Sequence, residues 1–165
     1  MPRLMALDVG EARIGVALSD ASGFLASPYT TLHVSRNESE TWTAIQTVIA
    51  ETEAEGLIIG LPISLDGQLH AQAERILAFA ERLKVHIALP VTFWDERLST
   101  VEAERLLAER GGKQRDRRQN RGSRGGQRRK RRGSQEIDAL AAAVILQEYL
   151  DQHFPQKATH AEDNL

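Results

Sequence analysis

Cysteine is absent from the 165 residues of this sequence. The chain can therefore form neither a disulfide framework nor a metal site with thiolate ligands. The five histidines also do not fall at the spacing of metal ligands. A chain without disulfides suits a reducing cytosol, and we expect the protein to be cytoplasmic.

Long apolar runs are missing as well. Beyond the N-terminus the longest run, residues 139–146, is far shorter than the roughly 20 residues that a membrane-spanning helix needs. The N-terminal stretch MPRLMALDVG does not resemble a signal peptide, because its apolar run is short and interrupted by Asp8. We therefore expect no membrane partner.

The charges are distributed unevenly along the chain. The composition, 41% hydrophobic and 27% charged, is that of one globular domain, and the net charge is only −2. Residues 113–132, however, carry eleven lysines and arginines and a single acid, Asp116. A basic segment on an otherwise acidic chain indicates a polyanionic partner.

Hydrophobic periodicity predicts the order of elements as β-β-β-α-β-α-β-α, then a basic loop and a last helix. Three antiparallel strands followed by helix-separated strands predict an α/β fold with a mixed five-stranded sheet and helices on both faces. We expect one domain over residues 1–154, with a flexible basic loop at 113–133 and a disordered tail at 155–165. The predicted strands are 4–9, 13–18, 24–34, 56–61 and 91–94, and the predicted helices are 38–53, 69–83, 99–110 and 134–152.

Acidic residues stand at the predicted ends of these elements. Asp8 ends the first strand, Asp95 and Glu96 follow the last strand, and Asp138 falls in the first turn of the predicted final helix. Any one of them could be a solvated loop residue or a helix cap. Together on one sheet edge, Asp8, Glu96 and Asp138 would form an oxygen-rich cluster suited to Mg²⁺. Two such ions can drive phosphodiester hydrolysis.

Four stretches resemble the signature blocks of the YqgF/RuvX family, and they occur in the family's order. They are DVGEARIGVALSD (8–20), GLPISLDG (60–67), WDERLSTVEA (94–103) and IDALAAAVILQEYL (137–150). Proteins of this family are described as pre-16S rRNA nucleases and as Holliday-junction-resolvase-like. The resemblance spans about residues 3–152, and the combination of the first and third blocks is highly specific.

The resemblance implies a ribonuclease-H-like fold and a Mg²⁺- or Mn²⁺-dependent nuclease that acts on structured nucleic acid. It further implies a role in ribosome biogenesis, in maturing the 5′ end of small-subunit rRNA. Carried over block by block, the catalytic and metal-binding residues would be Asp8, Glu96 and Asp138. Asp95 is the alternative to Glu96, which is favoured because related resolvases supply a glutamate there. The connection before Asp138 is longer and richer in arginine than is usual in the family.

Several cations are candidates for nucleic-acid contact. Arg97 could hold a phosphate or form a structural ion pair with Asp95 or Glu104, whereas Arg13 is expected to be a surface charge. Contacts from the basic segment would confer affinity rather than sequence choice. The predicted contact residues are Arg97, Lys113, Arg115, Arg117, Arg118, Arg121, Arg124, Arg128, Arg129, Lys130, Arg131 and Arg132.

Other functions remain open at this stage. The same acids could cut branched DNA, and a non-catalytic RNA-binding or ribosome-assembly module could keep the fold. An actin-like phosphotransferase is a further alternative, although such proteins usually need two domains of this kind. The sequence is compatible with a monomer or a homodimer, and a four-way junction with two symmetric scissile sites would favour the dimer.

Overall fold

The computed structural model describes residues 2–62, 70–95 and 126–155, without the side chains of residues 126–132 and 134. Of the helices in these ranges, none is both long and apolar enough to cross a lipid bilayer. The strands are β1 (Leu4–Val9), β2 (Arg13–Ser19), β3 (Ala26–His33), β4 (Gly56–Leu61) and β5 (Val91–Asp95), and the helices are α1 (Glu38–Thr52), α2 (Ala71–Lys84) and α4 (Gly126–His153).

The strands form one sheet in the order β3-β2-β1-β4-β5. Strand β1 pairs antiparallel with β2, because the connection between them is too short to cross the sheet. Strand β3 is also antiparallel, whereas β4 and β5 run parallel to β1, with α1 and α2 in the connections that precede them. This arrangement confirms the predicted mixed five-stranded sheet.

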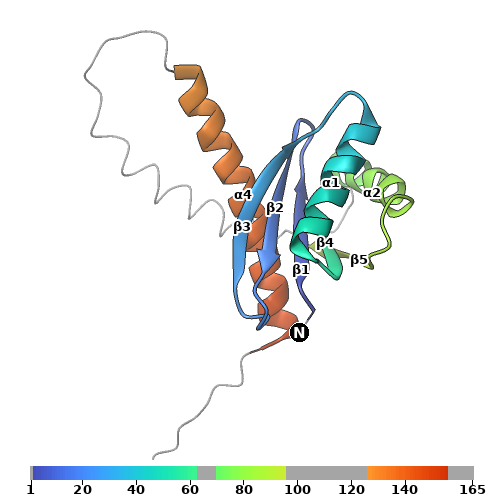
Figure 1. The fold of residues 1–165 in the computed structure, drawn as a ribbon, viewed down its shortest axis with the longest axis vertical. Helices are drawn as coiled ribbons and strands as arrows, with labels where there is room; N and C mark the ends of the chain where they lie inside the picture. Colours follow the sequence, from blue (N-terminus) through green and yellow to red (C-terminus); the bar gives the residue numbers. More distant parts are fainter. Residues whose placement is uncertain (1, 63–69, 96–125, 156–165) are drawn as a thin grey trace, which may run out of the picture.

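Helices cover both faces of the sheet, as predicted (Figure 1). Alternation along β1 directs Met5, Leu7 and Val9 into the core that α1 and α2 cover. Leu4 and Ala6 point the other way and pack against α4. Strand β4 is buried along its whole length, which explains why its sequence is an uninterrupted apolar run. The two faces of β1 are therefore distinct environments, and the face from which Asp8 projects decides which helix it meets.

The edge strand β3 carries Pro28. A shift in the β2–β3 register falls between Val16 and Ala17, which pair with Thr30 and Pro28. Proline cannot donate a ladder hydrogen bond, so an irregular edge strand tolerates it.

The start of the last helix is where the prediction was wrong. Helix α4 begins at Gly126, not near Ser134, so the end of the predicted flexible loop is helical. Arginine, lysine and glutamine are good helix formers, and their charge alone does not prevent a helix. Asp138 therefore lies inside α4 rather than in its first turn. The predicted helix 99–110, the remainder of the basic loop and the end of the tail lie outside the described residues, and the domain limits stay a prediction.

Candidate active site at the carboxyl end of β1

The first candidate acid, Asp8, lies one residue before the end of β1. It pairs across the sheet with Gly15 of β2. Directly opposed residues of two antiparallel strands project from the same face of the sheet. Asp8 also follows Leu4 and Ala6 at alternate positions, and both of these contact α4. The carboxyl group of Asp8 therefore projects toward α4.

The backbone of α4 approaches the sheet closely at Gly15. A Cβ atom added to Gly15 would lie only 1.9 Å from the carbonyl oxygen of Asp138. Asp138 precedes the fully buried Ala142 by one helical turn, so it belongs to the stripe of α4 that faces the sheet. Because Gly15 is the cross-strand partner of Asp8, its missing side chain brings the second acid beside the first.

Arg13 of β2 contacts the second of these acids, Asp138. Its guanidinium Nε lies 2.7 Å from Oδ2 of Asp138, and both atoms are buried, although their geometry does not make a hydrogen bond. The Arg13 side chain is 38% exposed, in keeping with the expected surface charge, but the structure adds an ion pair with Asp138 that was not expected. The sequence held a signal for this contact, since Arg13 and Gly15 lie on the same face of β2 by alternation.

The segment of α4 around Asp138 is also tied to the edge strand. The hydroxyl group of Thr31 donates a hydrogen bond to the carbonyl oxygen of Gln135. The side-chain amide of Gln135 lies 3.0 Å from Nε2 of His33. The turn of α4 that carries Asp138 is thus held by contacts with both β2 and β3.

The environment of Asp8 changes its ionisation. Burial, followed by the negative charge of Asp138, raises the pKa of Asp8 to about 6. At neutral pH the carboxylate is therefore ionised at a cost in free energy. Two carboxylates held this way are hard oxygen donors, and a divalent cation between them would offset their repulsion.

Comparison with known proteins identifies the family. The model of the RuvX family, described as Holliday junction resolvase, matches residues 2–152. This chain belongs to the RuvX family. Two similar relatives come from Thermoanaerobacter pseudethanolicus and Moorella thermoacetica, and both are named "Putative pre-16S rRNA nuclease". They are 40% and 42% identical to this chain over 149 residues, which is 90% of this chain and 96% and 94% of theirs.

Solved structures show the fold of this RuvX-family protein. Thermus thermophilus RuvC in complex with a Holliday junction substrate aligns with a TM-score of 0.54 and 12% identity. The alignment covers 93% of this chain and 96% of that one. A second T. thermophilus RuvC structure aligns with a TM-score of 0.50 and 11% identity, over 92% of this chain and 95% of RuvC. The predicted ribonuclease-H-like fold and the predicted family are both confirmed.

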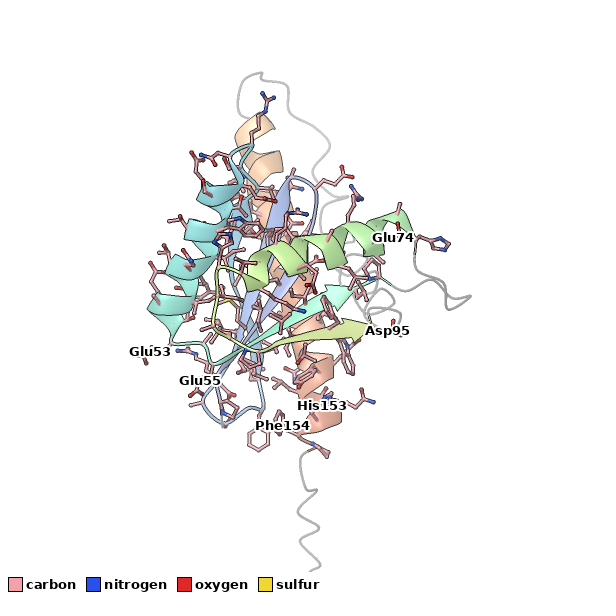
Figure 2. The ribbon with its side chains drawn as sticks, turned by 90° about the vertical axis from the view of Figure 1, so that its right-hand side faces the viewer. Glu53, Glu55, Glu74, Asp95, His153 and Phe154 are labelled. Carbon is pink, nitrogen blue, oxygen red and sulfur yellow. The ribbon has the colours of Figure 1, made fainter. Side chains whose placement is uncertain are left out.

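The other acid at a strand end, Asp95, belongs to the opposite face of the sheet. It is the last residue of β5 (Figure 2) and pairs with Leu61, which packs into the core beneath α1 and α2. Trp94, one residue earlier, packs on the α4 side. The described part of this RuvX-family protein thus brings together Asp8, Asp138 and Arg13, and within it no group of three potential metal-ligating side chains forms.

The remaining predicted site residues fall outside what the structure describes. Arg128, Arg129, Lys130, Arg131 and Arg132 belong to the first turns of α4, but their side chains are not described. The residues that lie entirely outside the described ranges are Glu96, Arg97, Lys113, Arg115, Arg117, Arg118, Arg121 and Arg124.

The raised pKa of Asp8 predicts a pH-dependent cost in stability. Below roughly pH 4 Asp8 is protonated in the folded and unfolded states alike, so its burial carries no ionisation cost. As the pH rises through about 6, Asp8 ionises in the folded state and the free energy of unfolding falls. Without metal, we expect Asp8→Asn to be more stable than the wild type at pH 8 by on the order of 2 kcal/mol. Urea unfolding in EDTA between pH 4 and 8 measures this difference. A difference that does not change with pH would contradict the prediction.

Proposed function

We propose that this protein is a metal-dependent nuclease that hydrolyses phosphodiester bonds in structured RNA, and that it processes the 5′ end of pre-16S rRNA in the cytoplasm. The observation that carries the proposal is the crowding of Asp8 and Asp138 on one face of the sheet, at the carboxyl end of β1. Membership of the RuvX family and the names of its relatives support a nuclease and this substrate.

The residues at this edge fit a Mg²⁺ or Mn²⁺ site. Asp8 and Asp138 offer hard oxygen donors, and the raised pKa of Asp8 reflects its burial first and the nearby charge of Asp138 second. We assign Glu96 as the third ligand. Trp94, two residues before it in the sequence, packs on the α4 side, whereas Asp95 belongs to the opposite face. The bound metal would supply an activated water and stabilise the leaving oxygen.

The protein's own cations would orient and hold the substrate. Arg13 holds the carboxylate of Asp138 through its ion pair and so positions a metal ligand. Arg97 and the cations of residues 113–132 are proposed to contact phosphates. The support for this is the concentration of eleven positive charges in a short segment. These contacts would supply affinity and a steep dependence on salt, not recognition of sequence.

Metal removal tests the proposed function directly. Full-length protein is incubated with a labelled pre-16S leader RNA and, in parallel, with a four-way DNA junction, in Mg²⁺, Mn²⁺ or EDTA. We expect the RNA to be cut with either metal and not in EDTA, because the carboxylates cannot activate water alone. Preferential cutting of the junction would replace the proposed substrate by branched DNA. Binding of RNA without any cutting would favour the assembly-factor alternative.

A further inference from the structure

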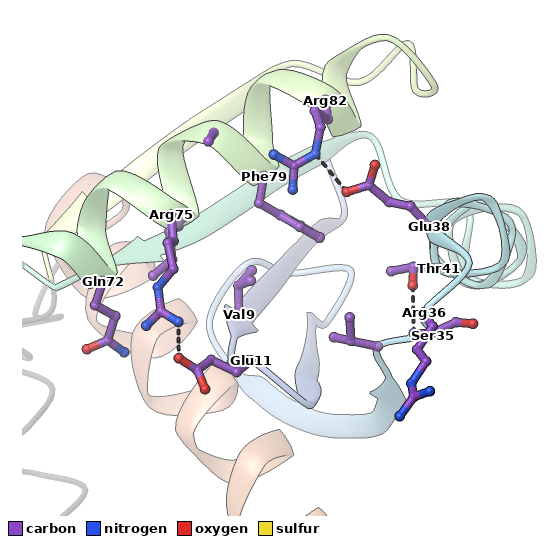
Figure 3. Close-up of a pocket in the computed structure, with 14 residues that line it drawn as sticks. Val9, Glu11, Ser35, Arg36, Glu38, Thr41, Gln72, Arg75, Phe79 and Arg82 are labelled. Carbon is purple, nitrogen blue, oxygen red and sulfur yellow. Dashed lines mark hydrogen bonds and ion pairs between the residues drawn. The ribbon is translucent and has the colours of Figure 1, made fainter.

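A cavity lies on the other face of the sheet from Asp8 and Asp138. It is a cavity of about 700 Å³ between the β1–β2 turn, the start of α1 and one side of α2 (Figure 3). Its size falls within the roughly 300–1,000 Å³ that is typical of small-molecule sites. Of the two described acids of the nuclease site, neither Asp8 nor Asp138 lines it.

The lining combines an apolar floor with a cationic rim. Val9, Ile76 and Phe79 form part of the floor, and the ring of Phe79 is itself supported by Trp42, with 5.1 Å between the ring centroids. Three arginines contribute to the rim, with two glutamates among the remaining lining residues. An apolar surface with guanidinium groups around it suits a planar base attached to a phosphate, because arginine binds phosphate oxygens and also stacks on bases. The three arginines are Arg36, Arg75 and Arg82.

The arginines are held loosely enough to exchange their partners. Arg75 pairs with Glu11 and Arg82 with Glu38 (Figure 3), and these four side chains are between 49% and 77% exposed. Ion pairs at such exposure contribute little to stability, so a phosphate could take the place of a glutamate at small cost. Within the described residues, Arg36 is exposed and forms no ion pair.

The cavity begins next to the proposed nuclease site. Val9 lines it, and the preceding residue of the chain is Asp8, whose side chain projects from the opposite face of β1. Gly10 and Glu11, which also line the cavity, form the turn at this edge of the sheet. A nucleic-acid strand lying across the turn would therefore reach both places with neighbouring nucleotides.

We propose that this cavity binds a single unstacked nucleotide of the substrate strand, next to the bond to be cut. The base would rest on Ile76 and Phe79, and its phosphate would contact Arg75 at one side of the cavity (Figure 3). The inference rests on the proposed nuclease function for its substrate, but the binding itself requires neither metal nor cleavage. Unpaired bases inserted into apolar pockets are a common means of recognising single-stranded RNA.

Binding of adenosine monophosphate to the full-length protein in EDTA tests the proposal, with adenosine and inorganic phosphate as comparisons. Amide NMR shifts are expected at Gly10, Arg36 and Gln72, and the monophosphate should bind more tightly than either comparison. We expect Arg75→Ala to weaken this binding roughly tenfold, through the loss of a charge-assisted hydrogen bond. Glu11→Gln should strengthen it, because the glutamate that competes with phosphate is gone.

Lys84→Ala is the matched control, since Lys84 also forms an ion pair on α2 but does not line the cavity. It should leave the affinity unchanged, as should Asp8→Asn, which separates this proposal from the nuclease assignment. Equal binding of phosphate and adenosine monophosphate, or shifts elsewhere, would overturn the proposal. An oligoribonucleotide should displace the monophosphate. If it does not, the cavity is a site for free nucleotides and the assignment to the substrate strand is wrong.

Discussion

Asp8→Asn is expected to abolish cleavage of the leader RNA while leaving RNA binding intact. Asparagine keeps the shape of the side chain but removes the negative charge that would hold the metal. Losing one carboxylate of the site should cost several kcal/mol of transition-state stabilisation. That corresponds to a fall in kcat on the order of a thousandfold or more. The measurement is single-turnover cleavage in Mn²⁺, with RNA binding followed separately by fluorescence anisotropy.

Asp151→Asn is the matched control for this experiment. Asp151 is also an aspartate near the end of an element, but it is exposed near the end of α4, where it accepts a hydrogen bond from Gln147. Its replacement should leave the cleavage rate within about twofold of the wild type, as for most surface substitutions. If Asp8→Asn cleaved as fast as Asp151→Asn, Asp8 would not be a metal ligand and the proposed site would be wrong.

Gly15→Ala is expected to destabilise this protein strongly. The new Cβ would lie 1.9 Å from the carbonyl oxygen of Asp138 and 2.3 Å from its carbonyl carbon. Both atoms belong to the backbone of α4, so no side-chain rotation can relieve the clash and the helix must move. Overpacking of this kind costs about 3 kcal/mol or more. The movement would also separate Asp138 from Asp8 and lower the pKa of Asp8.

Urea unfolding measures this effect, and Gly133→Ala gives a control of opposite sign. Gly133 lies within α4, and a Cβ added there meets no other part of the protein within 4 Å. Alanine should therefore stabilise the helix by roughly 0.5–1 kcal/mol, through its better helix propensity. If Gly15→Ala unfolded at the same urea concentration as the wild type, the close approach of α4 to β2 would be wrong.

Local patterns in the sequence were sufficient to predict the arrangement of the strands. Uninterrupted apolar runs identify the central strands, and the short β1–β2 connection forces an antiparallel pair, because three residues cannot cross a sheet. The signature blocks identify the family, which the comparisons confirm. The expectation that Asp8 and Asp138 share one edge of the sheet agrees with the structure, in which the charge of Asp138 acts on Asp8. Asp138 lies inside α4 rather than in its first turn as expected, and its role as a metal ligand stays a prediction.

The sequence by itself thus determined the sheet, the family and the position of Asp8 near the end of β1. Only the tertiary structure decided where α4 begins, that Arg13 pairs with Asp138, and that a cavity opens beside Val9. Each of these depends on which residues face one another across elements distant in the chain. Strand register and helix placement set those relations. A pattern of neighbouring residues does not determine strand register or helix placement, because the same periodicity is compatible with several packings.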